Sequence, residues 1–233
     1  MISIIIPTYN ERDNLPLLVE SIFGVFDGAF LKGELIIVDD NSPDGTGKIA
    51  DELALNSNMI KVVHRKAKEG LSGAVVEGIR YAEGEIIGVM DADLSHPPDV
   101  IPKLVRPIMN GESDFVVASR YKEKEQIEKW PLVRKIISRG ATLCAKPLTN
   151  ISDPMSGFFF IRKDVIDGVQ LTPVGYKILL EIIVKGKYNK IKEITFTFRD
   201  RYKGESKLNL KEHYNYILHL TRLYFYTLKK YVI

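Results

Sequence analysis

The 233-residue chain has a single cysteine, no low-complexity tract and no uncharged apolar run of about 18 residues. One cysteine excludes an intramolecular disulfide, which is consistent with a reducing compartment. Without a long apolar run, no segment is expected to cross a bilayer, so the protein is expected to be soluble or peripheral. The net charge of +3 is too small to indicate a nucleic-acid-binding protein.

What is present is an ordinary globular composition, with 45% hydrophobic and 27% charged residues. The length suits one large domain that buries its core without disulfides or structural metal. Residues 1–7 are apolar but lack a basic leader, so they predict a strand and not a signal peptide. Cys144 lies in an apolar stretch, where a buried, inert thiol is expected instead of a nucleophile.

Short apolar runs alternate with helical patterns through the first half of the chain. Runs suited to strands buried on both faces cover residues 2–6, 35–38, 60–63, 86–90 and 115–118. Helical patterns cover residues 15–26, 45–55, 71–82 and 98–109. This alternation predicts an α/β fold with a doubly wound, mostly parallel central sheet and helices on both faces.

The second half is less regular and shows no linker. It predicts a helix over 131–145, a loop over 150–156, a strand over 158–161, a helix over 174–185 and a strand over 191–198. We expect a catalytic domain over residues 1–210 and an amphipathic helix over 211–233.

Polar and acidic residues follow the predicted strands, where ligands bind in open α/β sheets. They are Thr8 to Glu11, Asp39, Asp40, Asp91, Asp93, Ser119 and Arg120. Asp91 and Asp93 are separated by one residue, so strand geometry would place them on one side with Ala92 facing away. Two hard oxygen ligands can share one Mg²⁺ or Mn²⁺, which assists a diphosphate leaving group. The alternative is a chance pair of aspartates in a loop.

Asp39 and Asp40 precede a run of turn-forming residues that also suits a helix start. A carboxylate in this place can form a cap and turn, or accept hydrogen bonds from a base or ribose. Both alternatives stay open.

Three ordered motifs resemble family 2 glycosyltransferases of the GT-A fold: Ile5-Ile6-Pro7-Thr8-Tyr9-Asn10-Glu11, Val38-Asp39-Asp40-Asn41-Ser42-Pro43-Asp44 and Met90-Asp91-Ala92-Asp93-Leu94-Ser95-His96-Pro97-Pro98. Segments 119–121, 130–135, 153–158 and 201–208 resemble the members that transfer mannose from GDP-mannose to a polyprenyl (dolichyl) phosphate with inversion. The resemblance extends to about Leu210. A UDP-glucose-dependent polyprenyl-phosphate glucosyltransferase and a non-catalytic nucleotide-sugar-binding scaffold are the alternatives.

The resemblance also implies the site residues. GDP would contact Pro7, Tyr9, Glu11, Val38 and Asp40, and the diphosphate and metal would contact Asp91, Ala92 and Asp93. Ser95 would be a further metal ligand, directly or through water, at a position where some relatives have glutamine. Arg120, Arg201 and Lys207 would contact phosphates. The acceptor phosphate would contact Arg134 and Ser138, and the sugar phosphate would contact Lys177. The alternative for each basic residue is a solvated surface side chain.

A phosphate acceptor is largely ionised at neutral pH, because its second pKa is near 6. It therefore needs cations that hold it against the donor, and no general base is assigned. In this scheme Asp93, Arg120, Arg134 and Arg201 carry catalysis through charge and positioning.

The segment from Leu210 to Ile233 mixes aromatic and aliphatic residues with Lys, Arg and His. It predicts an amphipathic helix that packs on the domain or lies on a membrane surface. A lipid acceptor implies peripheral contact at the cytoplasmic face of a membrane. Because several relatives continue into membrane-spanning helices, two alternatives stay open: a short form held by a small membrane-anchoring subunit, or a truncated chain.

Overall fold

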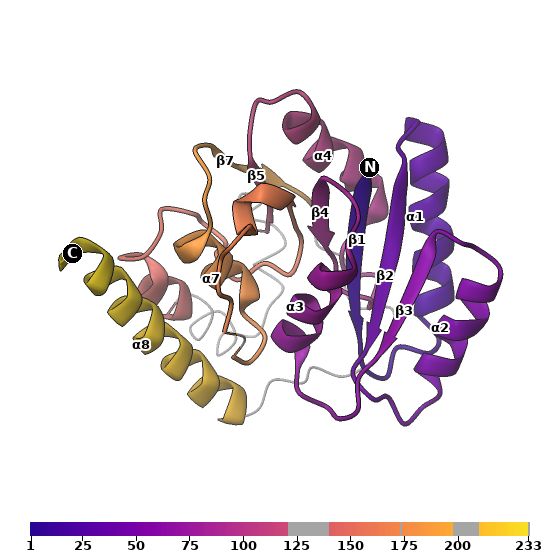
Figure 1. The fold of residues 1–233 in the computed structure, drawn as a ribbon, viewed down its shortest axis with the longest axis horizontal. Helices are drawn as coiled ribbons and strands as arrows, with labels where there is room; N and C mark the ends of the chain where they lie inside the picture. Colours follow the sequence, from indigo (N-terminus) through magenta and orange to yellow (C-terminus); the bar gives the residue numbers. More distant parts are fainter. Residues whose placement is uncertain (121–139, 173, 198–209, 233) are drawn as a thin grey trace.

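The computed structural model describes residues 1–120, 140–172, 174–197 and 210–232. Seven strands in this part of the chain form one sheet in the order β3-β2-β1-β4-β6-β5-β7 (Figure 1). β6 is antiparallel to both of its neighbours, and all other pairs are parallel. The strands are β1 (Ile2–Thr8), β2 (Gly33–Asp39), β3 (Ile60–His64), β4 (Ile86–Val89), β5 (Phe115–Ser119), β6 (Phe159–Arg162) and β7 (Ile191–Thr195).

The central strands are mostly apolar because both faces of the sheet are covered. Every residue of β1, β2, β4 and β5 is buried. Along β1, Ile4 and Ile6 pack into one core cluster and Ile5 into the other, as the two-residue period of a strand requires. The predicted α/β sheet and its strands are therefore confirmed, except that the strand predicted over 191–198 ends at Thr195, and residue 198 lies outside the described residues.

Helices α1 (Leu15–Ala29), α2 (Thr46–Leu55) and α4 (Ile101–Met109) contribute to the first core cluster. Helices α3 (Leu71–Tyr81) and α7 (Ile178–Lys185) contribute to the second. Short 3-10 turns, η1 (Pro98–Val100) and η2 (Lys163–Ile166), precede α4 and follow β6. The sheet thus has helices on both faces, as predicted.

Two predicted helices start later than the sequence suggested. The segment 98–109 begins as η1, because Pro102 has no N–H to complete an α-helical bond to the carbonyl of Pro98. That carbonyl accepts a hydrogen bond from Ile101 instead. The helix predicted from residue 174 begins at Ile178, after Gly175 in the left-handed region at φ 63°.

The prediction of a buried Cys144 was wrong, because this residue is exposed. Its neighbour Ala145 occupies the buried position and packs with Leu180, Leu220 and Leu223. Successive side chains of a helix are rotated by about 100° from one another, so an apolar helical stretch does not bury each of its residues.

Helix α8 (Leu210–Val232) lies at one end of the molecule beyond α7, and α1 and α2 lie at the opposite end (Figure 1). It is docked through Leu220 and Leu223, and the Tyr224 hydroxyl donates a 2.6 Å hydrogen bond to the carbonyl of Cys144. In the described ranges, no helix has both the length and the apolar composition needed to cross a membrane. The division into residues 1–210 and 211–233 stays a prediction.

The contact between α7 and α8 contains a buried charged cluster centred on Glu181, which has no exposed side-chain surface. Its Oε1 accepts hydrogen bonds from Lys185 Nζ at 2.5 Å and from the backbone N–H of Thr172 at 2.8 Å. His219 on α8 brings Nε2 to 3.6 Å from Oε2. Burial acts to raise the pKa of Glu181, but His219, Lys185 and Thr172 outweigh it and lower this pKa to about 2.

We therefore expect acid to destabilise the protein through Glu181. Its pKa is about 2 in the folded protein against 4.5 for an unperturbed glutamate, so its contribution is present above pH 4.5 and is lost as pH falls toward 2. The shift corresponds to stability on the order of 3 kcal/mol. Urea unfolding from pH 6 to pH 2.5 measures it, and Glu181→Gln should flatten the profile. If the free energy of unfolding fell with pH as steeply in Glu181→Gln as in the parent protein, the assignment of this acid sensitivity to Glu181 would be contradicted.

Candidate active site

The carboxyl ends of three parallel strands meet at one edge of the sheet. The N–H of Asp40 donates to the carbonyl of Thr8 at 2.9 Å, and the N–H of Met90 donates to the carbonyl of Ile5 at 3.1 Å. The segments after β1, β2 and β4 therefore lie next to one another, as expected for a ligand site in an open α/β sheet.

The antiparallel direction of β6 adds a fourth segment to this edge. Because β6 runs opposite to β4 and β5, its start lies where theirs end. The carbonyl of Phe158 accepts a 2.9 Å hydrogen bond from the N–H of Ala118 at the end of β5. The loop that leads into β6 thus lies beside the residues that follow β4 and β5.

The two aspartates lie in a turn and not on the strand, since β4 ends at Val89. Leu94 adopts φ 62°, an uncommon conformation for a residue with a side chain that often marks functional sites. The turn brings the N–H and the hydroxyl of Ser95 to Oδ1 of Asp93, at 3.1 and 2.5 Å. Ala92 is 3% exposed and packs in the core, so it faces away as predicted, but strand geometry is not the reason.

A neutral histidine orients the first aspartate. Nδ1 of His96 accepts a 3.1 Å hydrogen bond from the N–H of Asp91, so a neutral ring carries its proton on Nε2. Burial lowers the pKa of His96, although the negative charges of Asp91 and Asp93 act to raise it. The ring stacks on Phe158 with centroids 5.0 Å apart. His96 was not proposed as a site residue, although it stands inside the third motif.

The aspartate pair fits a divalent cation. Within the described residues, Oδ1 of Asp91 is buried without a hydrogen-bond partner, although 29% of the side chain is exposed. A carboxylate oxygen in this state suits a hard cation. Among the described residues, no group of three or more His, Cys, Asp or Glu side chains is arranged to hold a metal ion, so other ligands would have to come from phosphates or water.

Arg120 follows β5 and is held by a buried carboxylate that sequence reasoning did not single out. Its Nε and Nη2 donate to Oδ2 and Oδ1 of Asp153, at 2.7 and 2.8 Å. Such a two-point contact fixes the plane of the guanidinium. Burial acts to raise the pKa of Asp153, but the charge and hydrogen bonds of Arg120, with the charge of Lys177, lower it.

The loop that carries Asp153 is anchored on the edge strand β7. Glu193 accepts hydrogen bonds from the N–H groups of Ser152 and Asp153, at 2.9 and 3.1 Å. Lys177 reaches the same loop, with Nζ 3.5 Å from the carbonyl of Met155. Lys177 precedes α7 and is its N-cap, so it is not the helix-surface lysine of the alternative interpretation.

At the other end of the edge, Asp40 binds the loop between β3 and α3. Its carboxylate accepts from Nη1 of Arg65 at 2.5 Å and from the N–H groups of Glu69 and Gly70, at 3.0 and 2.8 Å. The same loop places Nζ of Lys68 3.7 Å from the ring centroid of Tyr9. Asp40 therefore shapes the rim, and its contact with a nucleoside stays a prediction.

The neighbouring acid, Asp39, forms a turn: its carboxylate accepts from the N–H and hydroxyl of Ser42, at 3.1 and 2.5 Å. Glu11 lies at this rim, where its Oε2 accepts a 2.7 Å hydrogen bond from Asn14. Pro7 and Val38 are paired across β1 and β2, and both are buried. The side chain of Val38 packs in the second core cluster, and we expect a nucleotide to contact the main chains of these two residues.

The structure thus brings Asp91, Asp93, Ser95, Arg120 and Lys177 to one half of the edge. Tyr9, Glu11 and Asp40 lie at the other half. Asp153, His96 and the glycine before Phe158 were missed as site residues, although the quoted motifs contain all three. The predicted positions Arg134, Ser138, Arg201 and Lys207 lie outside the described residues.

Solved structures with the same fold are glycosyltransferases. Glucosyl-3-phosphoglycerate synthase from Mycobacterium tuberculosis, in complex with uridine-diphosphate, aligns over 96% of this chain and 79% of its own with a TM-score of 0.70 at 20% identity. Its complex with Mn²⁺ and UDP-glucose gives 0.63 at 21% identity over 86% and 72%. Mannosyl-3-phosphoglycerate synthase from Rubrobacter xylanophilus gives 0.69 at 17% identity over 99% and 74%. The protein therefore has the GT-A glycosyltransferase fold, as predicted.

The sequence comparisons give the family. The glycosyl transferase family 2 model matches residues 3–169, and the chain belongs to this family. It is 48% identical over 226 residues to a dolichol-phosphate mannosyltransferase from Pyrococcus furiosus, covering 95% of this chain and 63% of that protein. Dolichol-phosphate mannosyltransferases from Mycosarcoma maydis and Saccharomyces cerevisiae are 40% and 38% identical over 95% of this chain, which covers 78% and 86% of their lengths. The chain thus spans less than two thirds of the Pyrococcus protein.

Proposed function

We propose that this glycosyltransferase transfers mannose from GDP-mannose to a polyprenyl (dolichyl) phosphate and forms a β-mannosyl phospholipid with inversion. The observation that carries the proposal is its 38–48% identity to three dolichol-phosphate mannosyltransferases over 95% of the chain. The paired aspartates at the sheet edge agree with this chemistry.

In the proposed complex, Asp91 and Asp93 hold Mg²⁺ or Mn²⁺ against the diphosphate, and Ser95 keeps Asp93 in place. When bound, the cation neutralises charge on the departing diphosphate. Tyr9, Glu11 and Asp40 lie along the nucleoside half of the edge, with the main chains of Pro7 and Val38. Arg120 and Lys177 supply positive charge beside the phosphates.

The acceptor phosphate needs no base, since it is largely dianionic at neutral pH. One of its oxygens forms the new bond to C1 of mannose, and the bond from C1 to the GDP oxygen breaks with its electron pair going to GDP. The protein orients the reactants and offsets repulsion between their phosphates. We assign the acceptor phosphate to Arg134 and Ser138, and the donor phosphates to Arg201 and Lys207 with Arg120.

A donor and acceptor panel tests the proposal. Purified protein is incubated with GDP-mannose, Mn²⁺ or Mg²⁺ and a polyprenyl phosphate, and the lipid fraction is assayed for mannose. We expect product with GDP-mannose, none with UDP-glucose and none with EDTA. Formation of glucolipid from UDP-glucose would show that UDP-glucose, and not GDP-mannose, is the donor. Binding of the nucleotide without any lipid product would favour a non-catalytic scaffold.

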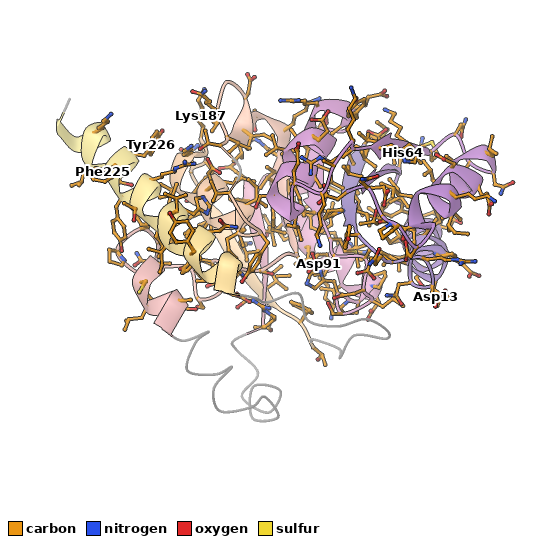
Figure 2. The ribbon with its side chains drawn as sticks, turned by 90° about the horizontal axis from the view of Figure 1, so that it is seen from below. Asp13, His64, Asp91, Lys187, Phe225 and Tyr226 are labelled. Atoms are coloured by element: carbon orange, nitrogen blue, oxygen red, sulfur yellow. The ribbon has the colours of Figure 1, made fainter. Side chains whose placement is uncertain are left out.

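The acceptor implies contact with a membrane, which we assign to the exposed face of α8. Tyr214, Ile217, Phe225 and Leu228 are 59–67% exposed, and their spacing places them on one face of the helix. Leu143, on the adjoining segment, is 71% exposed. Figure 2 shows Phe225 and Tyr226 at the end of the molecule opposite His64. Amphipathic helices of this kind lie in the membrane interface, and we place the protein at the cytoplasmic face. A small membrane-anchoring subunit stays a prediction.

We expect Ile217→Glu with Phe225→Glu to weaken binding to vesicles of phosphatidylcholine and phosphatidylglycerol by about 10-fold or more, because two apolar side chains leave the interface. Sedimentation of protein with vesicles measures this. Leu55→Glu is the matched control, since Leu55 is 87% exposed on α2 at the other end of the molecule. Equal losses of vesicle binding in the α8 double variant and in Leu55→Glu would contradict the assignment of the membrane contact to α8.

A further inference from the structure

Gly157 lies directly against the carboxylate of Asp91. A Cβ placed on Gly157 would lie 2.9 Å from each oxygen of this carboxylate and 3.1 Å from its Cγ. Protein side chains pack at van der Waals separations, which for carbon are about 3.5 Å or more. The carboxylate therefore occupies space that any other residue at position 157 would fill.

Backbone conformation does not require this glycine. The glycines of the described residues with positive φ are Gly45, Gly70, Gly111, Gly168 and Gly175, and Gly157 is not among them. An alanine at this position would meet no left-handed strain. What separates glycine from alanine here is the contact with Asp91.

A second residue closes in on Asp91 from its own turn. Nε2 of His96 lies 3.8 Å from Oδ2, while its Nδ1 accepts the N–H of Asp91. The stack of His96 on Phe158 ties this ring to the residue that follows Gly157. His96 therefore binds the main chain of Asp91, and the carboxylate of Asp91 lies close to both the His96 ring and Gly157.

We propose that Gly157 is a positioning residue for the cation site, because its missing side chain sets where the carboxylate of Asp91 lies. The inference rests on the proposed role of Asp91 as a cation ligand. Metal–ligand distances tolerate deviations of only about 0.2 Å. A Cβ at position 157 displaces the carboxylate or the loop by more than this, although the fold can absorb the change.

The first test is calorimetric binding of GDP to Gly157→Ala, in Mn²⁺ and in EDTA. We expect GDP affinity in Mn²⁺ to fall by 10-fold or more, and the affinity in EDTA to stay within twofold of the parent protein. Gly24→Ala is the matched control, because a Cβ on Gly24 meets nothing within 4 Å. This control should bind as the parent does under both conditions.

The second test needs neither metal nor activity. In metal-free protein, Gly157→Ala should lower the thermal unfolding temperature, and the same change made in Asp91→Ala should lower it much less, because the clashing carboxylate is gone. Non-additivity of this kind reports a direct contact between the two positions. Equal losses in both backgrounds would overturn the inference.

The outcomes separate the inference from the proposed function. If the parent protein binds GDP equally well in Mn²⁺ and in EDTA, the cation site is wrong and the role of Gly157 falls with it. If Mn²⁺ strengthens GDP binding to the parent and to Gly157→Ala alike, the cation site stands and only the role of Gly157 is overturned.

Discussion

Replacing Asp93 by alanine should abolish metal-dependent transfer while leaving the protein folded. The variant loses one of the two carboxylates assigned to the cation, and the charge on the departing diphosphate is then poorly neutralised. We expect kcat/KM to fall by about 10³-fold or more, since single groups that stabilise transition-state charge already contribute about 10²–10³-fold. The structural cost includes the two hydrogen bonds from Ser95, worth roughly 1–3 kcal/mol together.

Initial rates of mannolipid formation across a range of Mn²⁺ concentrations measure the effect. Ser95→Ala provides the graded comparison, because it removes one hydrogen bond to Asp93 but no carboxylate; we expect it to lose activity by about 10-fold, as orienting groups near metals do. Asp27→Ala on the surface of α1 controls for loss of a negative charge. Near-normal rates in Asp93→Ala at saturating Mn²⁺ would contradict the assignment of Asp93 as a ligand of the cation.

The sequence predicted the sheet because its central strands are buried on both faces and are therefore mostly apolar. β1 and β2 are examples, since neither shows the regular alternation of apolar and polar residues that a half-exposed strand would have. The starts of helices were harder to predict. At η1, a single missing N–H, that of Pro102, replaces the first α-helical turn by a 3-10 turn. The exposure of Cys144 depended on how its helical segment meets α7 and α8, and that contact joins residues far apart in the chain.

The site followed the same division. Asp91 and Asp93 were predictable because they stand directly after a buried strand. The roles of Asp153 and Gly157 were not, because both depend on the antiparallel direction of β6, and the local pattern of a strand carries no information on its direction. The sequence did contain a signal for Asp153, since an acid between serine and proline in a predicted loop is available to bind a basic side chain, but it did not identify Arg120 as the partner.

The buried pair of Arg120 and Asp153 leads to the second large effect. Arg120→Ala should reduce transfer by about 100-fold or more, because a cation beside the phosphates is lost. It should also destabilise the protein by about 3–5 kcal/mol, because Asp153 becomes a buried charge without its partner. Measured alone, this variant cannot separate a role in chemistry from a role in folding.

The double variant Arg120→Met with Asp153→Asn makes that separation. Both charges are removed together, and the asparagine oxygen can still accept the backbone N–H of position 120, which in the parent protein donates to Oδ2 of Asp153 at 3.2 Å. Because an ion pair replaced as a unit leaves no uncompensated charge, we expect urea unfolding to show most of the stability restored. Transfer should stay as low as in Arg120→Ala, since the cation is still absent. Recovery of transfer together with stability would instead make Arg120 a purely structural residue, and the phosphates would then depend on Lys177 and the cation for their positive charge.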